Sequence, residues 1–396
     1  MNSSSEYTPT TLPRQQATGR TRRHITIGLP ASNSADERRF PLTPEAAGML
    51  VERGFGIKVE SGAAAPIHYA DNSYSREGAE ICTRREALGC DIVIHLAPPS
   101  PEDISQMRRG AMLLSLLSVC RQTKQSVKAL LERNIMAIAI DLIEDPHGNT
   151  PFADILSEID GLASIATASA LLADSIHGKG ILLGGVAGVI PCETTILGSG
   201  IAARAAARAA AGAGATVRLF DNDIYRLREA TRDLGPWAVG SALHPRVLRN
   251  ALRTADIVVA TRMSDAPVFD SEAVNDMKKG VIIFDLTDDC GKIFPSLPSV
   301  DLASASATAA AHTSGGRCCY TGSGCAVPRT AAMALSNTFL TFFNDITDCE
   351  GVLNALKLQP GMQKAAYTFM GKAVNPAIAS IAGTRSGDIN IYLTLS

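Results

Sequence analysis

The chain has 396 residues, of which 46% are hydrophobic and 19% are charged, so it can hold two domains that each bury a core. Its 37 Lys and Arg side chains against 39 Asp and Glu give a formal net charge of −2. That balance argues against nucleic acid or an anionic membrane surface as the main partner. Nine cysteines without a C-x-x-C pair argue against a metal site or a disulfide framework and favour the reducing cytoplasm. No apolar run reaches the ~20 residues of a membrane span.

Residues 1–23 are rich in Ser, Thr and Arg and have almost no apolar clustering. The Arg and Ser bias weakly resembles a transit peptide, but no amphipathic helix is visible. We therefore predict a disordered leader.

An α/β unit is expected to follow over residues 24–155. Short apolar runs predict strands at His24–Gly28, Gly56–Glu60, Asp91–Leu96, Met112–Leu117 and Ala137–Ile140. Helices are predicted after Thr43, which precedes Pro44 as an N-cap residue should, and from about Thr123 to Glu132. This unit contains no glycine-rich phosphate motif.

A G-x-G-x-x-A motif opens a helix after a β-type run in the middle of the chain. Gly198 would allow the tight turn, Gly200 would let the backbone approach a pyrophosphate, and Ala203 would keep the helix close to the sheet. The backbone N–H groups of Ile201 and Ala202, at the start of the helix, would face the phosphates. Motif, strand and Ala-rich helix together predict a dinucleotide site rather than an ordinary βα turn.

Asp221 ends the next predicted strand, about 20 residues after the motif, where an acid accepts a hydrogen bond from a ribose 2′-OH. Because this carboxylate would repel a 2′-phosphate, NAD is favoured over NADP. Arg226 lies nearby in the sequence and keeps NADP open.

Two Rossmann-like, doubly wound α/β domains with a cleft between them are therefore predicted. A long helix, Ser157–His177, would lead into an NAD-binding domain over residues 156–329. Its later strands are predicted at Ile257–Ala260 and Val281–Asp285. Beyond Thr330 the sequence is helical, and residues 330–396 are expected to return to the first domain.

Several segments together resemble one protein family. They are Glu37-Arg-Arg39-Phe-Pro-Leu-Thr43-Pro44, Ser157-Glu158, Leu183-Gly-Gly-Val-Ala-Gly188-Val189, Asp285-Leu-Thr-Asp-Asp289-Cys-Gly291 and Val327-Pro-Arg-Thr330. From about residue 24 to 345 the chain resembles alanine dehydrogenase and the nucleotide-binding part of proton-translocating transhydrogenase. Residues 350–396 resemble that family poorly.

The resemblance implies a substrate domain built from both ends of the chain and an active site in the cleft. It places Arg39 where the family holds the substrate carboxylate, and Ser157 beside the cofactor. It places Asp289 near the nicotinamide and the reacting carbon, with Asp285 and Asp288 as competitors for that role. It also implies a homo-oligomer, a dimer or a hexamer.

Three positions depart from the family. Its catalytic lysine aligns with Ala97, its catalytic histidine with Ser118, and an asparagine that helps to close the substrate pocket with Gly322. Retained alanine chemistry is hard to reconcile with these residues, because oxidative deamination needs an acid/base group. His95 lies two residues before Ala97 on an extended strand and could take that role, or it could be a strand-end histidine bonded to a backbone carbonyl.

We therefore expect an NAD-dependent oxidoreductase that acts on a small amino or keto acid other than alanine. His95 or Asp289 would handle the proton, and Arg39 would hold the carboxylate. The alternatives are an NAD(H)-binding protein without catalysis, acting as a sensor or structural partner, and a soluble transhydrogenase component.

Overall fold

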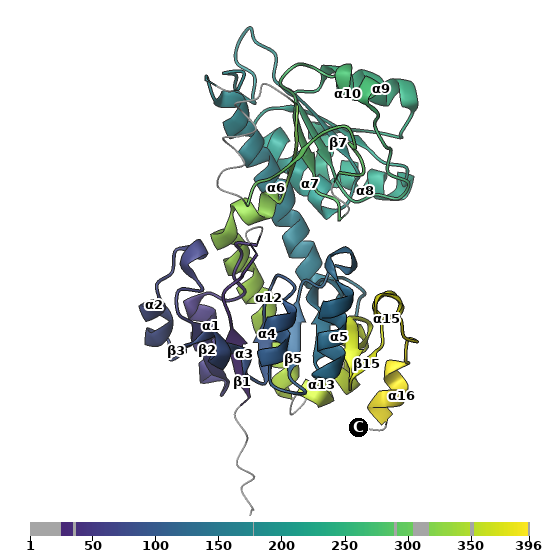
Figure 1. Ribbon diagram of the computed structural model, residues 1–396. Helices are drawn as coiled ribbons and strands as arrows, with labels where there is room; N and C mark the ends of the chain where they lie inside the picture. The colour runs from purple at the N-terminus through teal and green to yellow at the C-terminus, as the bar shows by residue number, and fades with distance from the viewer. Residues whose placement is uncertain are drawn as a thin grey trace, which may run out of the picture.

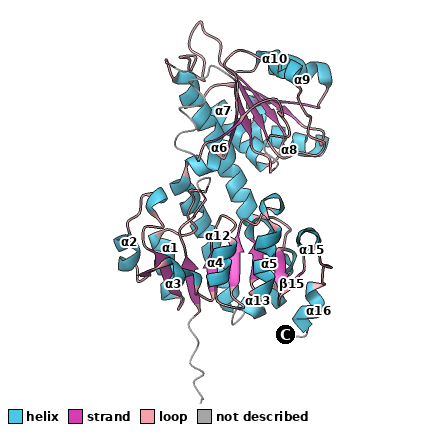
Figure 2. Ribbon diagram, in the orientation of Figure 1, coloured by secondary structure: helices cyan, strands magenta, loops and turns pink. Residues whose placement is uncertain are grey.

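Two α/β lobes make up the computed structural model, which describes residues 25–34, 37–176, 178–288, 291–303, 317–348 and 352–394 (Figure 1). Each lobe is a sheet with helices on both faces (Figure 2). Helices α6 (Pro151–Ala173) and α12 (Pro328–Asp348) connect the lobes and contact one another. The predicted fold class, two Rossmann-like doubly wound domains, is confirmed.

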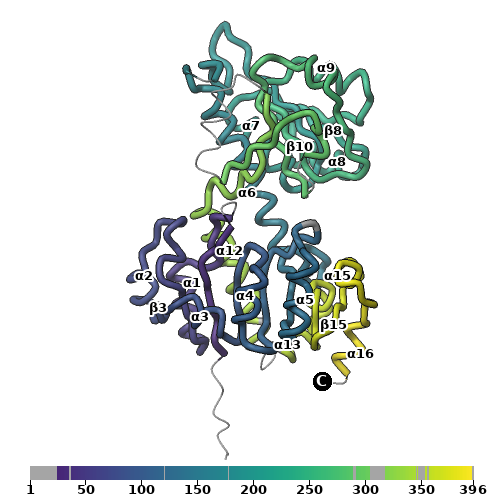
Figure 3. The backbone as a smooth tube through the Cα atoms, viewed as in Figure 1, coloured from purple at the N-terminus to yellow at the C-terminus, as the bar shows by residue number. Residues whose placement is uncertain are grey.

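The first lobe contains an eight-stranded sheet. Across the sheet its strands are β15 (Lys372–Ala373), β14 (Ala366–Phe369), β6 (Met136–Ala139), β5 (Met112–Ser115), β4 (Ile92–Ile94), β1 (Thr26–Leu29), β2 (Gly56–Glu60) and β3 (Glu80–Cys82). The strands from β3 to β6 pair in parallel, whereas β14 pairs antiparallel with both β6 and β15. The end of the chain thus completes the first sheet, and Figure 3 shows this segment beside α5 (Lys124–Glu132).

The second lobe contains a seven-stranded sheet whose pairs are all parallel. Across the sheet its strands are β12 (Ser299–Asp301), β13 (Cys319–Thr321), β11 (Ile282–Asp285), β10 (Ile257–Ala260), β7 (Glu193–Leu197), β8 (Thr216–Phe220) and β9 (Ala238–Ser241). The strand order reverses between β7 and β10. That switch point is where doubly wound sheets bind ligands, at the carboxyl ends of the strands.

Helices cover both faces of each sheet because the central strands are apolar on both faces. In the first lobe they are α1 (Pro44–Glu52), α2 (Asp71–Arg76), α3 (Arg84–Leu88), α4 (Pro101–Gln106), α5, α13 (Val352–Leu358), α14 (Pro360–Lys364), α15 (Pro376–Ala382) and α16 (Ile389–Thr394). In the second they are α7 (Ile201–Gly212), α8 (Ile224–Leu234), α9 (Pro245–Thr254) and α10 (Ser271–Asn275). Thr43 caps α1 as expected, accepting a hydrogen bond from the Ala46 N–H.

Helix α6 begins at Pro151, so the expected start at Ser157 was wrong. Proline is favoured at the first helical position because its missing N–H is not needed there. Ser157 consequently lies inside the helix. By length and composition alone α6 is also apolar enough to cross a membrane, but it packs against α7 and α12 and carries Asp154, Glu158 and Asp160.

Candidate active site

A cleft of about 790 Å³ lies between the lobes. It is lined by residues that follow the strands at the carboxyl ends of both sheets, together with one side of α6. These include Ala97, Ser118 and Asp141 after β4, β5 and β6, Gly200, Arg262 and Asp288 after β7, β10 and β11, Gly322 after β13, and Ser157 and Asp160 on α6. The volume lies within the range of about 300–1,000 Å³ typical of small-molecule and cofactor sites.

The two glycines of the motif, at the end of β7, are needed for different reasons. Gly198 has a φ of +104°, and a Cβ there would collide with the hydroxyl of Thr261, so the fold itself requires glycine. Gly200 has a φ of −72°, and a Cβ there would meet no atom within 4 Å. Gly200 lines the cleft, so the open space beside it is available to a ligand.

The start of α7 faces the same space. Gly200 is the N-cap residue and offers no side-chain cap, which leaves the first N–H groups of the helix available to an anion. Ile201 and Ala202 line the cleft, and Ala203 is fully buried behind them. Position 161 on α6 must be glycine, because a Cβ there would collide with the carbonyl oxygen of Ala202.

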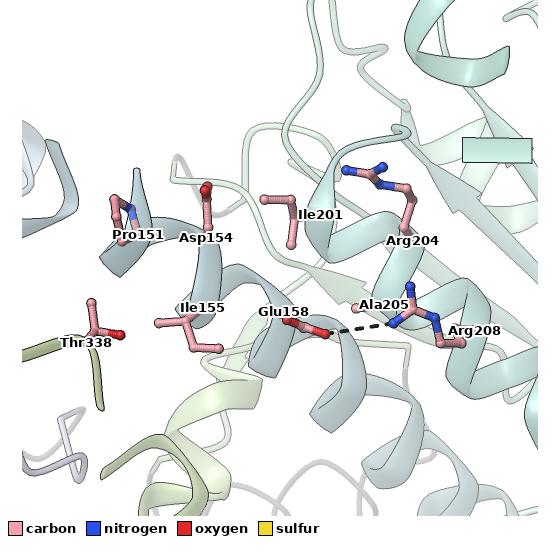
Figure 4. Close-up of a pocket in the computed structure, with 9 residues that line it drawn as sticks. All are labelled: Pro151, Asp154, Ile155, Glu158, Ile201, Arg204, Ala205, Arg208 and Thr338. Atoms are coloured by element: carbon pink, nitrogen blue, oxygen red, sulfur yellow. Dashed lines mark ion pairs between the residues drawn. The ribbon is translucent and has the colours of Figure 1, made fainter. Parts of the chain in front are cut away.

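A second hollow, of about 510 Å³, lies beside the first turns of α7 (Figure 4). Its wall is shared by α6, α7 and Thr338 of α12. Glu158 on α6 and Arg208 on α7 form an ion pair across it, with Oε1 and Nη1 3.8 Å apart. The pair is largely exposed and adds little stability, so the close contact at Gly161 is what fixes the position of the α7 N-terminus against α6.

Asp221 directly follows β8 and is 1% exposed. One carboxylate oxygen accepts a hydrogen bond from the Ser199 hydroxyl at 2.6 Å, and the other accepts from the Asp223 N–H at 2.9 Å. Asp221 is not among the residues that line the cleft, whereas Ser199 and Arg226, in the first turn of α8, do line it. Asp221 orients Ser199, and its hydrogen bond to a ribose 2′-OH stays a prediction.

Arg39 lines the cleft at the substrate end and forms a bidentate ion pair with Glu37. Its Nε lies 2.8 Å from Oε1 and its Nη2 lies 2.6 Å from Oε2. Burial acts to raise the pKa of Glu37, but the charge and hydrogen bonds of Arg39 outweigh it and hold that pKa below its usual value. Nη1 makes no hydrogen bond to the described residues and Nη2 keeps a second N–H, so these donors remain for a carboxylate.

A second acid, the half-buried Asp160, lies within Coulombic reach of the Arg39 guanidinium. Its Oδ1 accepts from the Gly324 N–H at 2.6 Å and from the Ser323 hydroxyl at 3.4 Å. Burial raises the pKa of Asp160, and Arg39 and these donors counteract the rise only in part. Burial also raises the pKa of the nearby Cys325 thiol to about 12, so Cys325 is not a nucleophile at neutral pH.

The three positions that depart from the family all line the cleft. Ala97 and Ser118 follow neighbouring strands of the first sheet, and Gly322 follows β13 of the second. Gly322 has a φ of +66°, and a Cβ there would collide with the Asp301 carboxylate. The local backbone therefore accounts for glycine at this position.

His95 does not line the cleft, so the expectation that its imidazole could reach the same space as Ala97 was wrong. The side chain is 3% exposed. Nδ1 lies 2.5 Å from the Ala97 carbonyl oxygen, and Nε2 lies 3.2 Å from that of Ala31. Its position matches the alternative reading, a strand-end histidine bonded to backbone carbonyls.

The acids at the end of β11 and just after it have different hydrogen-bond and ion-pair partners. Asp285 accepts from the Thr287 N–H and hydroxyl and from the Gly291 N–H, so it stabilises a turn. Asp288 pairs with Arg262 at 2.6 Å, and its side chain is 63% exposed. Asp289, the predicted catalytic acid, lies outside the described residues.

Asp141 was not anticipated as a site residue. It directly follows Ile140 in the short 3₁₀ turn after β6 and lines the cleft. The sequence held a usable signal, since an acid stands at the carboxyl end of a buried parallel strand.

Comparison with known proteins identifies the family. The model of the alanine dehydrogenase/PNT C-terminal domain matches residues 164–376, and that of the N-terminal domain matches residues 28–160. This chain belongs to the alanine dehydrogenase/PNT family. The match extends to residue 376, so the resemblance does not end near residue 345 as the motifs suggested.

Individual relatives agree with this family assignment. Alanine dehydrogenase of Mycolicibacterium smegmatis is 29% identical over 360 residues, which cover 89% of this chain and 95% of the relative. That of Staphylococcus saprophyticus is 28% identical, over 93% of this chain and 99% of the relative. A solved L-alanine dehydrogenase superposes with a TM-score of 0.78 at 25% identity, covering 90% of this chain and 99% of that chain. A transhydrogenase from Sinorhizobium meliloti, at 19% identity, shares the fold with a TM-score of 0.69 over 89% and 99% of the two chains.

The residues of the cleft fit NAD, the cofactor predicted for this family. Gly200 leaves open space where a pyrophosphate would approach the backbone, and the free N–H groups of α7 face that space. Arg226 and Ser157 line the same cleft.

Proposed function

We propose that the protein is an NAD-dependent oxidoreductase that acts on a small amino or keto acid other than alanine. The observation that carries this proposal is that one cleft contains both Gly200, with open space beside it, and Arg39, with a guanidinium nitrogen unused. In this proposal, the domain formed by residues 24–155 and 330–396 binds the substrate, and the domain formed by residues 156–329 binds the dinucleotide.

Arg39 would bind the substrate carboxylate through Nη1 and the second N–H of Nη2, because Glu37 accepts from Nε and from the first N–H of Nη2. The same ion pair fixes the plane of the guanidinium and so orients the bound acid. When bound, NAD would take a hydride from the α-carbon of an amino acid, or NADH would return one to a keto or imino acid.

A substrate other than alanine is proposed from the side chains near Arg39. Ala97 has a small side chain in the cleft, and Ser118 supplies no acid/base group. Gly322 adds no space, because the Asp301 carboxylate occupies the position that a Cβ would take. Asp160 adds a half-buried carboxyl within Coulombic reach of Arg39, and its Oδ2, which accepts no hydrogen bond from the described residues, suits a substrate with a hydrogen-bond donor.

The test is a survey of turnover. The full chain is incubated with NAD and a panel of L-amino acids that includes L-alanine, and with NADH, ammonia and the matching keto acids, while NADH absorbance is followed. We expect turnover with at least one acid at a higher kcat/KM than with alanine. Equal or faster turnover of alanine would overturn the substrate assignment, and no turnover across the panel would overturn the oxidoreductase.

A second candidate is an NAD(H)-binding protein without catalysis, and the absence of His95 from the cleft favours it. NAD(H) binding without turnover across the same panel would support that candidate. A soluble transhydrogenase component, the third possibility, would transfer hydride between dinucleotides and would not need Arg39 to bind a substrate.

We also propose a cellular location and an oligomeric state for the protein. Cytoplasmic location is favoured because described cysteines such as Cys192 and Cys318 form no disulfide. A homo-oligomer, dimer or hexamer, is favoured because Ile176, Leu182 and Ile190 expose most of their apolar surface in one segment. Light scattering of the purified protein would give the number of chains. Neither nucleic acid nor a membrane is proposed as a partner.

A further inference from the structure

Asp141 is an acid in the cleft whose hydrogen bonding is incomplete. The side chain lines the cleft at the carboxyl end of β6. Its Oδ1 is shielded from solvent and has no hydrogen-bond partner among the described residues. A carboxylate without a donor on one oxygen is less stabilised than a solvated one, and it gains more by accepting a proton.

The surroundings of Asp141 place it opposite the second lobe. Asp288 after β11 and Arg262 after β10 both act on it electrostatically across the cleft. Burial is the largest influence and raises the pKa of Asp141, and the negative charge of Asp288 adds to the rise. The positive charge of Arg262 and backbone hydrogen bonds from Leu117 and from Asp141 itself lower that pKa in part. In a doubly wound sheet the β10–β11 half is opposite the half that binds the adenosine, so Asp141 faces the nicotinamide half.

Other polar groups at this end of the cleft have hydrogen-bond partners. Asp160 accepts two hydrogen bonds on Oδ1 from the segment that follows Gly322. Asp285 accepts three from its own turn, and His95 lies against two carbonyl oxygens outside the cleft. Among the described acids that line the cleft, Asp141 is the one with a buried oxygen that lacks a donor.

We propose that Asp141 is a catalytic residue, the acid/base group of the reaction proposed above, on which this inference rests. In amino acid oxidation its carboxylate accepts one proton from the substrate α-ammonium group. An N–H bond breaks, its electron pair stays on nitrogen, and an O–H bond forms on Asp141. The neutral amine then forms the C=N bond as the hydride leaves the α-carbon for NAD. In the reductive direction Asp141 returns the proton to nitrogen.

The first experiment compares Asp141→Asn with Glu144→Gln in the full chain, using the best substrate from the panel. Glu144 is a matched control because it loses the same charge three residues away, where it pairs with Lys364 outside the cleft lining. We expect kcat to fall at least about 100-fold in D141N, with NAD binding by calorimetry unchanged, and to be unchanged in E144Q. The rise of kcat/KM with pH in the wild type, which reports ionisation of the base, should also be lost in D141N.

Two further readouts separate chemistry from structure. Asp141→Ala should regain activity when formate is added, because the small carboxylate can occupy the vacated space. NMR titration of the aspartate carboxyl carbons of the free protein should show a midpoint above the ordinary 3.8 that is missing from D141N, while the raised midpoint of Asp160 remains in both proteins. Wild-type turnover that D141N retains within about threefold would overturn this inference and leave the proposed function standing. No wild-type turnover with any acid would overturn the proposed function, and this inference with it.

Discussion

Replacement of Gly200 by alanine separates dinucleotide binding from folding. In the free protein the added methyl group meets no atom within 4 Å and the φ of −72° suits alanine. The expected loss of stability is therefore only about 1 kcal/mol, since alanine is a poorer helix N-cap than glycine. With dinucleotide bound, the methyl group occupies the space through which the pyrophosphate reaches the backbone. We expect the Kd for NAD and NADH to rise at least about tenfold, or about 1.4 kcal/mol.

Calorimetric titration and thermal unfolding together measure both effects, and Gly198→Ala is the matched control. Alanine at 198 is strained at a φ of +104° and collides with Thr261, so G198A should lose unfolding free energy, by about 1–2 kcal/mol from the backbone strain alone, whether or not ligand is present. If G200A folds normally and binds NADH as tightly as the wild type, the reasoning about this turn is refuted.

The remaining predictions concern buried groups around the cleft. Glu37→Gln should lower the free energy of unfolding by about 3 kcal/mol at neutral pH, because Arg39 keeps a buried charge without its partner. Because the folded-state pKa of Glu37 lies below 4.5, the difference in unfolding free energy between wild type and E37Q should be complete above about pH 4.5 and shrink as the pH falls through that pKa. A difference that urea titrations show to be independent of pH would contradict this. Gly161→Ala should cost about 1–3 kcal/mol and weaken NADH binding by displacing the start of α7, and unchanged values of both would refute the packing argument. His95→Gln should lower the melting temperature and leave the pH dependence of kcat unchanged, so a lost ionisation in that profile would restore His95 as a catalytic candidate.

The parts of the site set by local sequence could be predicted. The glycine turn, the strand before it and the start of α7 depend on residues within one short segment, and their bounds agree closely with the prediction. Most strands of both sheets were also predicted, because buried parallel strands are continuous apolar runs. The short edge strands β3, β9, β12 and β15 were missed, since they carry little apolar pattern. The interior strands β13 and β14 were missed as well, and the expectation that the chain is helical beyond Thr330 was wrong for β14 and β15.

Positions set by distant contacts could not be predicted. His95 lies outside the cleft, with its ring between the carbonyl oxygens of Ala97 and of Ala31, which is 64 residues earlier in the chain. Asp141 lies in the cleft because the second lobe packs opposite the end of β6, which the sequence does not show. Its place at the end of a strand was nevertheless a signal in the sequence. The start of α6 at Pro151 was a local signal that was overlooked.

Binding of NADH to the wild-type chain, followed by the fluorescence of the reduced nicotinamide, tests the central claim most directly. The account predicts saturable binding of one NADH per chain, tightened by a keto acid in the wild type and not when Arg39 is replaced by Met. A chain that is folded by circular dichroism and yet gives no saturable change with NADH would contradict it.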